Sequence, residues 1–475
     1  MQQKKSIGFG FRGWMLMLWA ATGMFAYLII GNYPLNILSD LYGGSQTLST
    51  IYTVASIVGI VVQLAISSKA GKIKSWKTLG VIFGVITILC LLGIMFLQPG
   101  TAWLIVYGLG TVISLLYGTW ILSVLVGIWF PRRKGTVMGI VTFAYPIGNG
   151  IIGFFAEGYF AKYGTLMGTQ AEAKIGELIA SGTDAAAAEG IVSGQFAQAT
   201  SATAFIPYLI VIVVGLIIGI ILIKDFPELC GCYRDNDKSI TPEVANAMMK
   251  AEEENRRTSV WTTGHTMGSA DFWLISIPCG LLLMFSVGAM TQTNAIITPY
   301  AEDLAWIGGY TGVMMAIAIF GIIGSYVFGL VDTKFGTRKS LIISMLCMIA
   351  SGILGAIDNA IALFISLLLL AMFMGASSNF TVSAAVQYWR IEDFPSVFSV
   401  VNPIANILNA IGPMVIAMLI ATSMGKTAVF IVCGIAGVVG LVLMLLFKPA
   451  RVKAKDDKFR AAAGKPLDDV LVGRK

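Results

Sequence analysis

Twelve apolar stretches, each about as long as a helix that crosses a bilayer, run through the 475-residue chain. A spanning helix needs about 20 mostly apolar residues, because the bilayer core holds no water to bond exposed backbone groups. Only 12% of the residues are charged, about half the share in soluble domains. This composition predicts an all-α integral membrane protein and excludes a secreted disulfide scaffold, a disordered chain and a nucleic-acid-binding module. The predicted spans are 13–33, 48–68, 79–97, 102–130, 136–159, 204–224, 272–299, 307–331, 340–357, 360–389, 396–421 and 427–447.

A polar segment at 225–271 divides these stretches into two groups of six. The segment holds a helix start at 241–243 and a charged run at 250–257, so we expect a linker with a short surface helix. A second polar segment, 161–203, is rich in Ala, Gly, Gln and Thr, and we expect a partly helical excursion on the outer face. The predicted organisation is a first half at 1–224, the linker at 225–271, a second half at 272–447 and a tail at 448–475.

The distribution of Lys and Arg predicts how the chain is oriented in the membrane. Twelve spans put both termini on one side, and 29 of the 32 Lys and Arg fall in the segments of that side. Only Lys162, Lys174 and Lys426 fall on the other. Because cytoplasmic loops carry the excess of cations, we expect a multi-pass protein of the cell membrane with both termini in the cytoplasm. The net charge of +7 is then a topology signal, and no nucleic-acid partner is expected.

The two halves share short motifs in the same order. The pattern S-x-x-V-x-x-W at 123–129 recurs at 383–389. The tetrapeptide P-I-G-N at 146–149 recurs as P-I-A-N at 403–406. Together the matches predict a duplicated six-helix unit, the arrangement of transporters whose halves rock about a site at the membrane midplane.

The sequence resembles the major facilitator superfamily. The loop G-L-V-D-T-K-F-G-T-R-K at 329–339 is similar to that superfamily's cytoplasmic signature, although Asp332 follows Gly329 by three residues where four is usual. The equivalent first-half loop, 70–77, lacks the acidic residue. The resemblance implies the twelve-helix major facilitator fold and a cytoplasmic gate that the carboxylate helps to latch, so Asp332, Gly336 and Arg338 are the expected gating residues.

A finer resemblance concerns two cytoplasmic segments. Residues 226–237, F-P-E-L-C-G-C-Y-R-D-N-D, resemble the pattern that follows helix six in oxalate/formate antiporter-like carriers, and 130–135 looks like their loop between helices four and five. This likeness implies small organic anions, especially monocarboxylates, as substrates.

Charged residues are absent from the middle of every predicted span. Oxalate/formate antiporters place buried cations in helices eight and eleven, whereas 306–331 and 396–421 contain no Lys or Arg. Desolvating two negative charges without a buried cation is costly, so a doubly charged substrate is not expected.

Neutral polar side chains remain as candidates for a substrate site. Asn402, Asn406 and Asn409 follow i, i+4, i+7 spacing and share one helix face. Amides are disfavoured against lipid, so this face either lines a cavity or packs helices together, and both interpretations stay open. The aromatic candidates could equally be core packing. The full predicted set is Tyr27, Tyr117, Trp120, Tyr145, Asn149, Gln292, Asn294, Asn379, Ser383, Asn402, Asn406 and Asn409.

Two prolines lie inside predicted helices. Pro146 and Pro403 are expected to kink helices five and eleven and to free backbone groups. Freed N–H groups and the partial positive charge of a helix N-terminus could help to hold one carboxylate. Both residues are therefore expected to take part in gating. The alternative is a purely structural kink that helps the helices to pack.

The chain shows none of the patterns of an enzyme. It has no phosphate-binding G-x-x-x-x-G-K-[ST] loop, no nucleophile–base constellation and no metal-ligand cluster. Cys230 and Cys232 have no second pair beside them, and His265 is the only histidine. We therefore expect no enzymatic activity, cofactor or metal.

These observations predict a secondary active transporter that works by alternating access. The expected substrate is a small organic anion, most plausibly a monocarboxylate, moved by proton-linked transport, anion exchange or uniport. The alternative is an uptake carrier for a larger amphipathic carboxylate, such as a bile acid or steroid-like acid. A hydrophobic-compound exporter, a non-transporting sensor and a membrane-embedded enzyme remain weaker hypotheses. The expected partners are the substrate, a proton and the lipid bilayer, with the protein as a monomer.

Overall fold

A computed structural model describes residues 8–37, 44–67, 69–148, 162, 165–237, 241–465 and 467. Within these ranges every regular element is a helix. The first half contains α1 (Phe11–Ile37), α2 (Gly44–Ser67), η2 (Ala70–Lys72), α3 (Trp76–Phe96), α4 (Thr101–Leu115), η3 (Leu116–Ile121), α5 (Leu122–Trp129), α6 (Lys134–Val141), α8 (Ala171–Ala180) and α9 (Ala185–Leu222).

The linker and the second half continue the helical pattern. The linker contains η4 (Pro227–Cys230), η5 (Arg234–Asn236), α10 (Pro242–Arg257) and α11 (Thr263–Met267). The second half contains α12 (Ala270–Thr291), α13 (Thr293–Ile297), η6 (Thr298–Tyr300), η7 (Ala305–Ile307), α14 (Gly309–Phe335), α15 (Thr337–Ala356), α16 (Ala360–Tyr388), α17 (Phe394–Ile420) and α18 (Lys426–Leu446), and the tail forms α19 (Pro449–Ala462).

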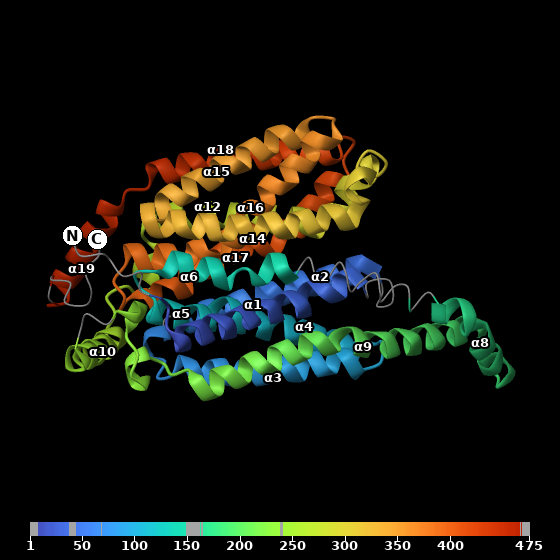
Figure 1. Ribbon diagram of the computed structural model, residues 1–475, viewed down its shortest axis with the longest axis horizontal. Helices are drawn as coiled ribbons and strands as arrows, with labels where there is room; N and C mark the ends of the chain where they lie inside the picture. The colour runs from blue at the N-terminus through green and yellow to red at the C-terminus, as the bar shows by residue number, and fades with distance from the viewer. Residues whose placement is uncertain are drawn as a thin grey trace.

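The long helices lie lengthwise in two layers (Figure 1). One layer holds the helices of the first half, and the other holds α12 and α14 to α18. The layers meet where α6 packs on α14 and where α2 packs on α17. The boundary between the halves therefore runs along helices two, five, eight and eleven of the predicted order.

Ten helices of the described chain are long and apolar enough to cross a membrane, and α2 adds a shorter apolar run at Thr50–Ile66. The fifth predicted span, 136–159, is described only as far as residue 148. The sixth differs from the prediction at its start, because α9 is one continuous helix of 38 residues from Ala185. Part of the expected outer loop is thus an extension of helix six, which projects beyond the bundle together with α8 (Figure 1).

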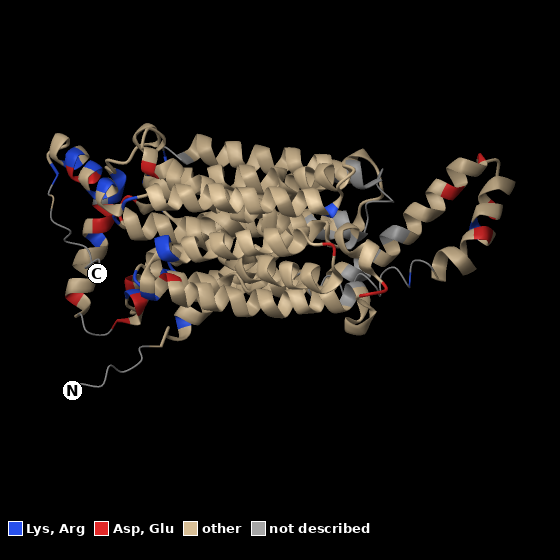
Figure 2. Cartoon of the chain, turned by 90° about the horizontal axis from the view of Figure 1, so that it is seen from above, with Lys and Arg blue, Asp and Glu red and all other residues tan. Residues whose placement is uncertain are grey.

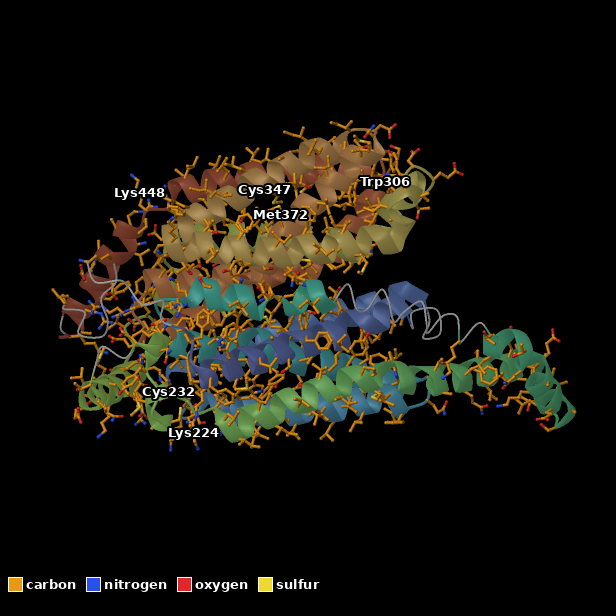
Figure 3. The ribbon with its side chains drawn as sticks, viewed as in Figure 1. Lys224, Cys232, Trp306, Cys347, Met372 and Lys448 are labelled. Atoms are coloured by element: carbon orange, nitrogen blue, oxygen red, sulfur yellow. The ribbon has the colours of Figure 1, made fainter. Side chains whose placement is uncertain are left out.

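Charged side chains gather at the ends of the bundle and leave its middle almost free of them (Figure 2). Most of the Lys and Arg lie at the end that carries α10 and α19, which we call the basic end. Lys224, Cys232 and Lys448 mark this end in Figure 3, and Trp306 marks the opposite end. The apolar middle is what a bilayer requires of a chain that spans it.

Glycines set the packing distance between α1, α3 and α9. Trp19 of α1 is fully buried, and its ring lies where side chains at Gly80 and Gly219 would otherwise begin. Thr22 occupies the corresponding space beside Gly215. Small residues four apart let helices approach closely, and here Trp19 and Thr22 fill the space that these glycines leave.

We expect Gly219→Leu to destabilise the protein, because the new side chain must displace the Trp19 ring. Overpacking of this kind costs about 1–3 kcal/mol. The measurement is the melting temperature of the purified protein in detergent. Gly190→Leu is the matched control, since Gly190 belongs to the same helix and nothing lies within 4 Å of its added Cβ. Equal melting temperatures for the two variants would contradict this account.

Candidate functional site

The fourth predicted span contains a π-helical segment, η3, between α4 and α5. π segments inside α-helices are rare and are frequent at functional sites. Two predicted residues, Tyr117 and Trp120, lie in it. Tyr117 is fully buried inside the first half, where its hydroxyl accepts a hydrogen bond of 2.8 Å from Trp19 Nε1. Trp120 instead reaches the other layer, where its Nε1 donates to Ser399 Oγ at 2.9 Å.

A chain of four amides crosses the boundary between α2 and α17. Asn409 Nδ2 donates to Asn406 Oδ1 at 3.4 Å, and Asn406 Nδ2 donates to both Asn402 O and Asn402 Oδ1 at 3.0 Å. Asn402 Nδ2 then donates to Gln63 Oε1 of α2 at 3.5 Å. Thr381 of α16 donates to the same Asn402 Oδ1 at 3.4 Å. The three predicted asparagines are therefore brought together, and all lie under 10% exposed.

Gln63 was not predicted from the sequence, and the one signal that points to it is an amide inside an apolar stretch, which is disfavoured against lipid. It is the only amide in the apolar stretch 48–68, and it is fully buried. The sequence pattern of α2 offered no second amide at helical spacing, so no face stood out. Its partner comes from the other half of the chain, which one-helix periodicity cannot reveal.

A second contact between the halves joins Asn379 to the fifth helix. Asn379 Nδ2 donates to Thr142 Oγ1 at 3.0 Å, and both side chains are buried. The fifth helix is interrupted by a turn at residues 142–143. Pro146 explains the interruption, because it lacks the N–H that would bond to the carbonyl of Thr142. The Tyr145 N–H bonds to that carbonyl instead, at 3.1 Å.

Pro146 and Pro403 differ in their effect on the backbone. Pro146 packs on Gly321 of α14, so the break in helix five lies at the boundary between the layers. Helix α17 continues as one element through Pro403 and does not divide into half-helices there. The free helix N-terminus considered for Pro403 is thus not formed in this structure.

Tyr27 belongs to a cluster of tyrosines inside the first half. Tyr27 and Tyr52 share a hydrogen bond of 2.8 Å between their hydroxyls, and both rings lie against Gly31. The Tyr107 hydroxyl donates to the carbonyl of the same glycine at 2.8 Å. Tyr145 is half-buried. These tyrosines form a cluster that is separate in the hydrogen-bond pattern from the amide chain.

The remaining predicted residues are Ser383, Gln292, Asn294 and Asn149, and the structure describes only some of their side chains. Ser383 is fully buried on α16, and its Oγ has no hydrogen-bond partner among the described residues. Gln292 is half-buried just after α12. Asn294 lies in α13, with its side chain outside the described part, and Asn149 lies outside the described residues.

The predicted gate lies where α14 ends at the basic end. Asp332 is buried, and its Oδ1 accepts a hydrogen bond from the Thr337 hydroxyl at 2.6 Å. Its Oδ2 lies against Gly135 in the first turn of α6, where the partial positive charge of a helix N-terminus favours a carboxylate. Beside it, Thr333 Oγ1 accepts from the Thr136 N–H at 2.9 Å. Asp332 thus faces the other half of the molecule.

Among the residues that the structure describes, the contacts of Gly336 and Arg338 lie within the second half. Gly336 has a φ of +89°, and the Gln387 amide lies 2.7 Å from the Cβ that another residue would place there. Arg338 donates to the carbonyls of Met444 and Leu445 at 3.2 Å, in the last turn of α18. A cation at that position favours the helix C-terminus. These two residues hold the loop in shape while Asp332 makes the contact between halves.

The linker fixes the loop between helices four and five. Asp235 is buried and accepts hydrogen bonds from the N–H groups of Arg132 and Arg133, the closest at 2.9 Å. Arg132 also pairs with Asp237 at 3.1 Å. Asp235 of the 226–237 segment therefore has a structural role, since it binds the turn immediately before α6.

The tail fixes the loop between helices ten and eleven in a comparable way. Arg460 of α19 pairs with Glu392 at 2.6 Å and with Asp393 at 2.7 Å. Asp456 of the same helix accepts from Arg390 at 2.8 Å and from Trp261 Nε1 of the linker at 2.9 Å. The linker therefore holds the loop between helices four and five, and the tail holds the loop between helices ten and eleven. In each half this is the last loop that is predicted to face the cytoplasm.

We expect Asp393 to make the stability of this tail contact depend on pH. Burial raises the pKa of Asp393 from 3.8 to about 6, and Arg460 and Ser259 lower it less than burial raises it. A raised carboxyl pKa adds stability that is full below the unfolded value near pH 4 and is lost as pH rises through 6. The advantage of wild type over Asp393→Asn should therefore shrink by on the order of 2 kcal/mol between pH 4.5 and pH 8.

Melting temperatures of both proteins in detergent across that range check the prediction. Asp457→Asn is the control, because Asp457 is a more exposed carboxylate of α19 that pairs with Lys453 at 3.5 Å. The account fails if the difference between wild type and Asp393→Asn is the same at both ends of the range.

The described residues contain no group of three or more His, Cys, Asp and Glu side chains arranged to hold a metal ion. Among the described residues, the side chains that form hydrogen bonds between the halves in the membrane region are amides, hydroxyls and one indole. Such groups can form hydrogen bonds to a ligand.

Comparison with known proteins places this geometry in a known fold. The sequence model of the Major Facilitator Superfamily matches residues 279–474, which include the 329–339 loop. Comparison with curated proteins finds no match. The matched segment lies in the second half, the half whose signature loop keeps its acidic residue.

Three solved structures are similar over nearly their whole length. They are a proton:xylose symporter of the major facilitator superfamily, XylE (TM-score 0.62, 12% identity, 91% of this chain and 95% of that one), the human organic anion transporter MFSD10 (0.55, 11%, 90% and 97%) and a bacterial homologue of the human lysosomal transporter Spinster (0.50, 13%, 93% and 97%). The prediction of fold class is confirmed: this is an all-helical multi-pass membrane protein with the major facilitator fold.

Proposed function

We propose that the protein is a secondary transporter that moves a small organic anion with one negative charge, a monocarboxylate, by alternating access. The observation that carries the proposal is the boundary between the layers, where buried neutral polar groups from both halves meet inside an apolar bundle. Gln63 with Asn402, and Thr142 with Asn379, are the contacts that join the two halves there. A site built from both halves changes when the halves rock, which is what alternating access requires.

The charge distribution supports a singly charged substrate. In the described spans the charged side chains lie near the helix ends, and the middle of the bundle carries almost none (Figure 2). Amide and hydroxyl donors can satisfy one carboxylate, because hydrogen bonds to a charged group contribute about 1.5–3 kcal/mol each. A dicarboxylate would need a buried cation to offset the cost of its second charge.

The fold supports transport rather than catalysis. Two of the similar structures are named as a proton:xylose symporter and an organic anion transporter. For this chain we propose the basic end as the cytoplasmic side, following the positive-inside rule. Asp332 against Gly135 would then hold the cytoplasmic side closed in this conformation.

The way in which transport is coupled to a proton or to a second anion depends on the titrating groups between the halves. The contacts between halves in the membrane region use amides, hydroxyls and an indole, so the protein offers no proton acceptor there among the described residues. We propose that a proton, where one is moved, travels on the substrate's own carboxyl group, and that exchange of two anions is the other mode.

Reconstitution into liposomes tests the proposal. We expect saturable uptake of formate, acetate or lactate, faster with an inward proton gradient or with the same anion inside. Oxalate should be excluded. Uptake of bulky bile acids alone would favour the larger amphipathic carboxylate, and no uptake of any acid would overturn the proposal.

Within such an assay, Asn406→Ala and Asn409→Ala should impair transport while expression stays normal. Asn406 holds the centre of the amide chain, so its removal interrupts both of its neighbours. We expect uptake to fall by about 10-fold or more for Asn406→Ala, since each lost hydrogen bond leaves a buried polar group without its partner. Ser351→Ala is the control, because Ser351 is a buried hydroxyl that bonds to Ser366 within the second half. Wild-type rates in both asparagine variants would show that this face is packing.

A further inference from the structure

The amide chain between α2 and α17 has a direction, and the backbone fixes that direction. Asn406 Nδ2 lies 3.0 Å from the main-chain oxygen of Asn402. A carbonyl oxygen can only accept, so the Asn406 atom facing it must be the nitrogen. The Asn402 atom that faces the same nitrogen at 3.0 Å must then be its Oδ1.

The remaining orientations follow from this one. Asn402 Oδ1 faces Asn406, so Asn402 Nδ2 faces Gln63 and must donate to Oε1 at 3.5 Å. At the other end, Asn406 Oδ1 faces Asn409 and must accept from its Nδ2 at 3.4 Å. Every amide therefore donates toward Gln63, and no amide can be turned without opposing two donors or two acceptors.

The two ends of the chain carry unused hydrogen-bonding capacity of opposite sign. Gln63 Nε2 has no partner among the described residues, and Asn409 Oδ1 has none either. Gln63 is fully buried and Asn409 is 8% exposed. A buried donor without a partner is costly, so the N–H₂ group of Gln63 is a position where a ligand's acceptor atom would gain most.

The chain also polarises that donor. Hydrogen bonds in series strengthen one another, and their dipoles point the same way here. The side chains of Asn406 and Asn409 donate to positions four and three residues earlier, the direction in which backbone N–H groups of α17 also point. The positive end of the helix dipole and the positive end of the side-chain chain are therefore aligned.

We infer that Gln63 Nε2 is the donor that binds the charged oxygen of a carboxylate substrate, with the chain Asn409–Asn406–Asn402 supplying positive potential in place of a cation. The inference rests on the proposed function and assigns the anion's charged end to one atom. It explains how a bundle without a buried Lys or Arg among its described spans can hold a negative charge. It also places the charged end at a contact between the halves, since Gln63 belongs to α2 and Asn402 to α17.

The experiment is counterflow of radiolabelled acetate, formate and L-lactate in liposomes that contain the full chain, with acetamide as the neutral competitor of the same shape. Wild type should prefer acetate over acetamide. Gln63→Glu puts a carboxylate at the binding atom, and we expect the half-saturating concentration of the carried acid to rise by about 10-fold or more. Gln63→Met removes the donor at similar volume, and a rise of about 10-fold is expected.

Two further variants separate an electrostatic role from packing. Gln63→Asn keeps the amide but withdraws its nitrogen by one methylene, so its half-saturating concentration should lie between wild type and Gln63→Met. Asn409→Leu removes only the far end of the chain, and we expect a smaller rise of about two- to threefold. Inhibition by acetamide should change little in any of them, because a neutral amide gains little from the potential.

The outcomes distinguish this inference from the proposed function. Carriage of an acid by wild type with unchanged half-saturation in Gln63→Glu and Gln63→Met would overturn the role of Gln63 and leave the transport proposal standing. A parallel loss of acetate and acetamide recognition would show a structural role instead. If wild type carries no acid, both proposals fail. Gel filtration establishes whether each variant is folded, and Ser351→Ala is the control for the loss of a buried hydrogen bond elsewhere in the chain. If Gln63→Glu does not fold, Gln63→Met and Gln63→Asn decide the question.

Discussion

The constraint behind this structure is that polar groups inside a bilayer must find their partners within the chain. Many buried side chains at the boundary of the layers meet it with one another: Trp120 bonds Ser399, Asn379 bonds Thr142, and Asn402 bonds Gln63. Because these three bonds join opposite halves, they also hold the halves together. A moving pair of halves must break such bonds and remake them elsewhere, so a ligand that replaces a partner can shift the balance between two conformations.

Close packing of small residues makes these side-chain contacts possible. Gly139 of α6 lies against the backbone of α14 at Ser325 and Gly329, and Gly324 lies against the backbone at Met372 of α16, a residue labelled in Figure 3. Contacts between backbones leave little room for water and few side chains to reorganise. Near the basic end these helices therefore contact one another through glycines, with Asp332 and its neighbouring threonines as the polar element at the edge.

Much of the fold could be predicted from the sequence, because hydropathy marks spanning helices directly and the cations mark one side. The helix-eleven face could also be predicted, since Asn402, Asn406 and Asn409 share a helical period. What could not be predicted depends on distant chain segments. Gln63 and Ser399 gain their roles from partners 339 and 279 residues away. Arg338 was expected at the gate. Its guanidinium donates to a carbonyl at the end of α18, and this partner is too distant in the chain to be read from the sequence pattern. Helix six was predicted to start near 204, because the polar residues of 185–203 conceal a continuous helix that leaves the apolar region.

The π-helical turn at Leu116–Ile121 has a consequence for the relation between the two halves. A π turn holds one residue more than the α turn it replaces, so it can accommodate an inserted residue without rotating the rest of the helix. The corresponding helix of the second half, α16, is α-helical throughout. The backbone that carries Tyr117 and Trp120 therefore differs from the backbone of α16. The two halves differ in shape at this level, so a ligand held between them would contact two unlike helix surfaces.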